Sequence, residues 1–251
     1  MSNAGEILKS GPFDKAADLL HRLAGPMFDE FGAMLADKVR VYRVKNLIST
    51  VKRTERLLKD AGLPANVVPP RLLLPIIENC SVEDNDTLQD MWAGLLATAS
   101  QETDSASPSF IETLKQLTPD DARHLEVICQ DSIQHFNDIR ERTKHFGNKF
   151  EKKDRICDGM TLAPWAFGGF RFKGPERFDV PPSVYADTYV RLGLIRTTFE
   201  VSSSFDRRDL DAYGDEGIHQ EVNSEVDGWY EFTEYAVRFL DACNGPEKQA
   251  K

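Results

Sequence analysis

Apolar residues recur at three- and four-residue steps through most of the first half of the chain, which is the period of amphipathic helices. The pattern covers residues 13–35, where Gly25-Pro26 must interrupt it, so two helices are expected there. A long helix is predicted over residues 37–60, because Gly62 and Pro64 follow and stop it.

The next stretch of the chain predicts a buried helix hairpin. A short apolar helix is expected over residues 71–79. Ser81 is then predicted to cap a helix that begins at Val82, since acidic residues fill its first turn. The apolar stripe of this second helix should anchor the core, and its predicted anchors are Trp92, Leu95 and Leu96.

Polar, turn-rich residues follow this hairpin and predict a domain boundary. We expect a helical domain over 5–101, a linker at 102–109 and a second domain over 110–245. The second domain should contain helices at 110–117, from Pro119, at 182–192 and at 234–243, with strands at 194–199 and 228–232.

The order helix, strand, loop, strand, helix near the C-terminal end resembles a winged-helix domain, here with an insertion at about 141–180. The predicted fold class is therefore mainly α: a helical N-terminal domain plus an α+β winged-helix-like C-terminal domain with a small β-hairpin. Thr233 is predicted to cap the closing helix, and Gly193 to close the helix before the hairpin.

Composition and charge narrow the classes of function. The chain has 251 residues, 41% of them hydrophobic, and a net charge of −10, which suits a globular protein and disfavours nucleic acid and anionic membranes as partners of the whole surface. The four cysteines lie far apart without a C-x-x-C pair, so neither disulfides nor a zinc site is predicted. No apolar run approaches the ~20 residues of a membrane span, and a cytoplasmic location is expected.

The long helix at 37–60 concentrates positive charge. One interpretation is a surface for the phosphates of nucleic acid or lipid headgroups. The other is a solvated helix face whose charges pair with solvent or with the acidic start of the helix that Ser81 is predicted to cap. If this helix contacts a partner, the candidate residues are Arg40, Arg43, Lys45, Lys52, Arg53 and Arg56.

A second stretch, residues 163–178, mixes aromatic side chains with Arg171 and Lys173. Such a mixture could stack on and neutralise single-stranded nucleic acid. It is also typical of an extended segment whose aromatic side chains are pinned to a core.

No chemical site is predicted, so no catalytic residue, cofactor or metal is expected. Asp209, Asp211 and Asp215 resemble part of a calcium loop, but Gln220 stands where the bidentate glutamate belongs. Asp131 and His135 share a helix face without a complement from a second helix. No G-x-S-x-G turn presents a serine nucleophile.

A resemblance carries the functional prediction. Leu88-Gln89-Asp90, Met91-Trp92-Ala93 and the run from Ser109 to Ala122 resemble bacterial proteins of the abortive-infection alpha family, and the likeness covers roughly residues 20–130. The resemblance implies a non-enzymatic phage-defence protein. We expect it to act through contacts with a protein partner or a second copy, with two alternatives: a nucleic-acid-binding winged-helix regulator, or a peripheral membrane-associated effector.

Overall fold

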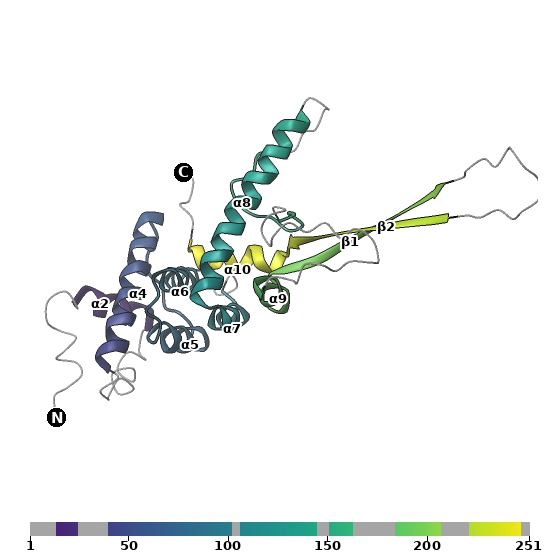
Figure 1. Ribbon diagram of the computed structural model, residues 1–251. Coiled ribbons are helices and arrows are strands. Elements are labelled where there is room, and N and C mark those ends of the chain that lie inside the picture. The colour runs from purple at the N-terminus through teal and green to yellow at the C-terminus, as the bar shows by residue number, and fades with distance from the viewer. Residues whose placement is uncertain are drawn as a thin grey trace, which may run out of the picture. The chain divides into compact units, whose positions relative to one another are not determined.

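The computed structural model describes residues 14–24, 40–101, 106–144, 151–162, 184–206 and 221–246. In chain order its elements are α2 (Asp14–Ala24), α4 (Arg40–Ala61), α5 (Pro70–Cys80), α6 (Asp86–Ala99), α7 (Pro108–Gln116), α8 (Pro119–Thr143), α9 (Val184–Arg191), β1 (Ile195–Asp206), β2 (Glu221–Phe232) and α10 (Glu234–Asn244) (Figure 1). The predicted mainly helical fold with a β-hairpin near the C-terminal end is confirmed.

Two compact units make up the chain, one of residues 1–124 with 238–251 and one of residues 125–237. The predicted linker at 102–109 lies partly outside the described residues, and the predicted domain limits and winged-helix likeness stay predictions.

Helix α6 is the centre of the first unit. Helix α4 packs along it, and α5 and α7 also contact it (Figure 1). All three predicted anchors are buried: Trp92 is 2% exposed, and Leu95 and Leu96 are fully buried. Burial of one such side chain stabilises a fold by roughly 1.5–3 kcal/mol, so α6 contributes much of the core of this unit.

The C-terminal end of α10 also packs on α6, with backbone against backbone. A Cβ atom at Gly94 would lie 1.7 Å from the carbonyl oxygen of Cys243, so only glycine fits there. One turn further along α6, the buried Thr98 hydroxyl donates a hydrogen bond of 2.9 Å to the carbonyl oxygen of Ala242. This contact holds the C-terminal end of α10 on the central helix α6.

The predicted start of the central helix is wrong. The helix begins at Asp86, where the Asn85 side chain accepts a hydrogen bond from the Leu88 amide. Ser81 instead ends α5, and its hydroxyl donates to the carbonyl oxygen of Glu78. Both residues are good capping types, but Asn85 is the one that stands in extended conformation before the helix, as an N-cap requires.

Other helix boundaries follow the sequence signals. Helix α4 ends before Gly62, whose φ of 74° is readily adopted by glycine. At the start of α8, the Asp121 amide donates to the Thr118 hydroxyl and the Thr118 amide donates to the Asp121 carboxylate, a reciprocal cap. The second helix expected within residues 13–35 lies outside the described residues, which resume at Arg40.

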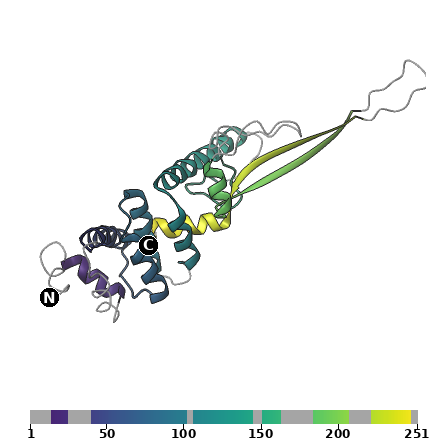
Figure 2. The same ribbon diagram turned by 60° about the horizontal axis from the view of Figure 1, so that its bottom comes forward.

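A two-stranded antiparallel sheet dominates the second unit. Strands β1 and β2 pair from Ile195 opposite Phe232 to Asp206 opposite Glu221, and the ribbon runs away from α9 (Figure 1, Figure 2). Both strands are longer than predicted. The alternation of Val201 and Phe205 with serine already had the period of a strand, but the polar composition masked it.

The base of the hairpin is held as the sequence predicts. Gly193 has a φ of 72° at the end of α9, and the Thr233 hydroxyl accepts from the Ala236 amide to cap α10. A short antiparallel bridge joins Thr161 to Glu231 on the outer side of β2.

The cysteines provide a test of the core. Burial raises the pKa of Cys80 to about 12, although the Thr50 hydroxyl beside it acts in the opposite direction. Burial, with Glu126 nearby, also raises the pKa of Cys129 to about 12, and burial raises the pKa of Cys243. The pKa of a cysteine thiol in an unfolded chain is about 8.5, so the pKa values in the folded protein lie above those in the unfolded chain.

The stability of the protein should therefore fall in alkali. The stabilisation from these thiols is complete below about pH 8.5 and is lost as the pH rises, by roughly 1 kcal/mol per pH unit and per thiol. Denaturation in urea at a series of pH values measures the loss, and a thiol reagent at about pH 8 should reach Cys80 and Cys243 only after unfolding. Rapid labelling of Cys80 in the native protein would contradict the packing described here.

Candidate contact surface

The buried face of α4 is unusually polar. Asn46, Thr50 and Thr54 are buried along it, one turn apart, beside Leu47 and Val51. The Asn46 side chain donates to the carbonyl oxygen of Ser81, and the Thr54 hydroxyl donates to that of Ala93 in α6. Since buried polar groups are costly without partners, these two bonds fix how α4 lies against the end of α5 and against α6.

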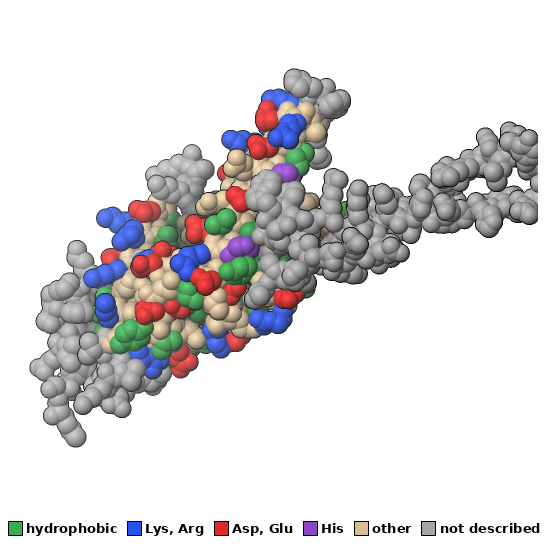
Figure 3. Space-filling view, in the orientation of Figure 1, with side chains coloured by type: hydrophobic (Ala, Val, Ile, Leu, Met, Phe, Trp, Pro, Cys, Tyr) green, Lys and Arg blue, Asp and Glu red, His purple; other side chains and the backbone are tan. Residues whose placement is uncertain are grey.

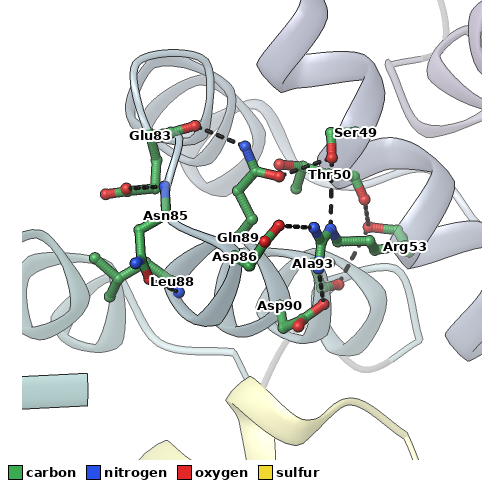
Figure 4. Close-up of polar contacts among 11 residues, drawn as sticks. Ser49, Thr50, Arg53, Glu83, Asn85, Asp86, Leu88, Gln89, Asp90 and Ala93 are labelled. Atoms are coloured by element: carbon green, nitrogen blue, oxygen red, sulfur yellow. Dashed lines mark hydrogen bonds and ion pairs between the residues drawn. The ribbon is translucent and has the colours of Figure 1, made fainter. Parts of the chain in front are cut away.

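A chain of hydrogen bonds continues this polar seam between the two helices (Figure 4). The Ser49 hydroxyl donates to the Gln89 side-chain oxygen over 2.7 Å. The Gln89 side-chain amide in turn donates over 2.8 Å to the carbonyl oxygen of Glu83. Gln89 is 4% exposed, so this network is shielded from water and specifies one register of α4 on α6.

Two of the predicted contact residues belong to this seam. The Arg53 guanidinium bridges Asp90, at 2.5 Å, and Asp86, both on α6 (Figure 4). Burial opposes its charge, but the hydrogen bonds and charges of Asp90 and Asp86 outweigh that effect and raise the pKa of Arg53. The Arg43 side chain donates to the Ser81 hydroxyl over 3.0 Å. Both arginines therefore attach α4 to its neighbours.

Replacing Arg53 with methionine is expected to lower the free energy of unfolding by about 1 to 2 kcal/mol. The change keeps the length of the side chain and removes two charge-assisted bonds, to carboxylates that are themselves well exposed. Urea denaturation measures the effect, and high salt should reduce the difference between the two proteins. Replacing the exposed Lys52 with methionine is the matched control and should change stability by less than about 0.5 kcal/mol.

The remaining cations lie on the opposite face of α4. Four exposed cations, Lys45, Lys52, Arg56 and Lys59, form a row along the helix that we name the α4 ridge. Basic side chains gather over α4 in the space-filling view (Figure 3). Within the described ranges, no carboxylate forms an ion pair with any of the four. The Arg40 side chain lies outside the described part of the chain.

The sequence interpretation treated the basic residues of α4 as one set and missed the polar seam that divides them. Its signal was present: Asn46, Thr50 and Thr54 recur at four-residue steps, and Ser49 and Arg53 repeat the spacing beside them. A polar stripe at helical period predicts a hydrogen-bonded contact with a neighbouring helix. The opposite face of the same helix is then exposed to solvent.

The other candidate sites from the sequence either lie outside the described residues or show no metal-binding arrangement within them. The aromatic stretch 163–178 and the acidic loop 209–215 lie outside the described residues. Asp131 and His135 lie on α8, and the described residues contain no group of three or more histidine, cysteine, aspartate or glutamate side chains placed to hold a metal ion. No helix within the described ranges combines the length and apolarity needed to cross a membrane.

Comparison with known proteins gives one match. The sequence model of a protein family described as abortive infection alpha matches residues 42–243, which include all of α5 to α9, the hairpin and most of α4 and α10. Neither the curated proteins nor the solved structures give a match.

Proposed function

The chain belongs to the abortive infection alpha family, and from this premise we propose that it is a bacterial phage-defence protein that acts, without catalysis, through protein–protein contacts made by the α4 ridge. The separation of the cations on α4 is the observation that carries the proposal. Arg43 and Arg53 bind residues of neighbouring helices or their caps, whereas the side chains of Lys45, Lys52 and Arg56 are exposed to solvent.

Exposed cations in a row favour an anionic partner. Lysine and arginine at four- and three-residue steps share one side of a helix, so a partner can meet them together. An acidic protein surface is the partner class that this row fits.

The second unit supports a role in protein contact as well. In chain order, α9, the hairpin and α10 follow the order of a winged helix, although most of α10 belongs to the first unit. The two strands carry Arg196 as their single cation against six aspartates and glutamates. An acidic wing repels the DNA backbone. For this unit, the proposed role is therefore protein contact or structural support, without DNA binding.

A phage challenge tests the proposed function. Cells that make the protein should form fewer plaques than cells with an empty vector for at least one phage in a broad panel. The same phage should then be used on cells that make a ridge variant, K45E/K52E/R56E. Equal plaque numbers for ridge variant and wild type, at equal protein levels, would contradict a role for the α4 ridge.

A matched control separates the ridge from total charge. Arg71, Arg142 and Lys152 are also exposed and are not part of α4. The variant R71E/R142E/K152E therefore makes the same change in net charge without changing the ridge. This control variant should protect as wild type does.

A further inference from the structure

The cations of the α4 ridge have the spacing of side chains that meet another helix. Along the chain, successive members are seven, four and three residues apart: Lys45, Lys52, Arg56 and Lys59. At the rise of an α-helix these steps are about 10.5, 6 and 4.5 Å. A second helix laid along α4 presents side chains on one face at the same steps, whereas a strand presents them about every 6.8 Å. The ridge therefore matches the side of a helix better than an extended peptide.

An exposed apolar pair lies at the N-terminal end of the ridge. Tyr42, 45% exposed, comes three residues before Lys45 on the same side of α4, and Val82 is 53% exposed. The Asn46 side chain, one turn after Tyr42, donates to the carbonyl oxygen of Ser81, the residue before Val82. Both apolar side chains thus border the same hydrogen bond. Tyrosine is enriched among the residues that dominate protein contacts, so this end of the ridge can anchor a partner.

Carboxylates border the ridge on the side of α6. Arg53, next to Lys52 in the chain, points toward α6 and binds Asp86 and Asp90 there (Figure 4). The side chains of the two aspartates nevertheless stay 86% and 64% exposed. A partner helix, about 10 to 12 Å wide, can lie on the ridge alone. A DNA duplex or an anionic membrane is far wider, so its phosphates would also lie over these carboxylates and be repelled.

From the spacing, the apolar end and the acidic border, we infer that the α4 ridge binds an acidic amphipathic helix of another protein. That helix lies along α4, with carboxylates on the ridge and an apolar side chain on Tyr42 and Val82. The inference rests on the proposed function, because it names the partner of the same surface. The net charge of −10 acts weakly on such a contact, since charges further away than about 8 Å are largely screened at physiological salt.

Fluorescence anisotropy with designed peptides and the full chain tests the inference. The patterned peptide is a labelled helix with glutamates at the steps of the four ridge cations and a leucine three residues beyond, opposite Tyr42. The comparison peptide has the same composition, with its glutamates spread around the helix. A hydrocarbon staple keeps both peptides helical. In about 150 mM salt the patterned peptide should bind roughly tenfold more tightly, because it alone can form the whole row of ion pairs.

Charge exchange tests the basic part of the surface. The ridge variant K45E/K52E/R56E should bind the patterned peptide at least about tenfold less tightly than wild type does. A third peptide, with lysines in place of the glutamates, should bind this variant and not wild type. The exchange guards against loss of binding through misfolding, since a misfolded ridge variant would bind neither peptide in this pattern-dependent way.

The apolar end is tested by Y42A/V82A. This variant should bind the patterned peptide about five- to tenfold less tightly than wild type does, in about 150 mM and in about 500 mM salt alike, because salt does not screen an apolar contact. The control variant R71E/R142E/K152E should bind as wild type does. Unchanged binding by Y42A/V82A would overturn the apolar anchor and with it the amphipathic helix as partner.

Three further results would overturn the inference: equal binding of the patterned and comparison peptides, no binding of the patterned peptide up to about 1 mM, or tighter binding of a DNA duplex. The phage challenge separates these failures from failure of the proposed function. A ridge variant that fails to protect, without peptide binding by wild type, would overturn the acidic helix as partner and leave the proposed function in place. Peptide binding as predicted, with a ridge variant that still protects, would support the inference and count against the α4 ridge as the defence surface.

Discussion

Replacing Gly94 with alanine is expected to lower the free energy of unfolding by about 3 kcal/mol or more. The new Cβ atom would lie 1.7 Å from the carbonyl oxygen of Cys243 and 2.4 Å from its carbon, both of them backbone atoms that no side-chain rotation can move away. The end of α10 must then separate from α6, which also breaks the buried hydrogen bond from Thr98 to Ala242. Overpacking of this kind typically costs about 1 to 3 kcal/mol, and a backbone clash lies at or above the upper end.

Gly62→Ala is the matched control for this prediction. It makes the same chemical change at a residue with a φ of 74° and no atom within 4 Å of the new Cβ. Backbone strain alone costs about 1 to 2 kcal/mol there. Guanidinium denaturation of both variants measures the difference, and a Gly94→Ala protein as stable as Gly62→Ala would show that α10 does not lie on α6 as described.

Replacing Trp92 with alanine is expected to cost about 3 to 5 kcal/mol of stability. The side chain is 2% exposed in the middle of α6, and its removal leaves a cavity between helices that cannot close around it. Because a domain is stable by about 5 to 15 kcal/mol, this one change should remove a large part of the total. The midpoint of guanidinium denaturation should fall accordingly.

Tyr42→Ala serves as the comparison for Trp92→Ala. Tyr42 is an aromatic residue of α4 that is 45% exposed, so its loss should cost less than about 1 kcal/mol. Equal costs at the two positions would contradict the placement of Trp92 at the centre of the first unit.

Periodicity was enough to predict most helices, since each carries its own start and stop signals. Thr118-Pro119 and Gly62 are examples, where the cap and the left-handed glycine were readable from the chain alone. Choosing between neighbouring signals was harder. Ser81 and Asn85 are both capping residues, and the turn at the end of α5, where Ser81 binds back to Glu78, decides that Asn85 caps α6.

Long-range contacts could not be predicted from local patterns. Gly94 gave no sign that the end of α10 lies against it, since its partner residues come about 150 positions later in the chain. Which cations of α4 are bound and which are exposed also depends on a neighbouring helix. Arg53 is bound because α6 places Asp86 and Asp90 beside it. The packing of α4 on α6 leaves the side chains of Lys45, Lys52 and Arg56 exposed to solvent.

The central claim is that the exposed cations of the α4 ridge form the contact surface. It is tested most directly by plaque counts for a phage that the wild-type protein restricts. Cells should make K45E/K52E/R56E or R71E/R142E/K152E at equal levels, and both proteins should melt within about 3 °C of wild type because all six positions are exposed. We predict that plaques return to the empty-vector number with the ridge variant and stay at the wild-type number with the control variant. Equal protection by the two variants would contradict the α4 ridge as the contact surface.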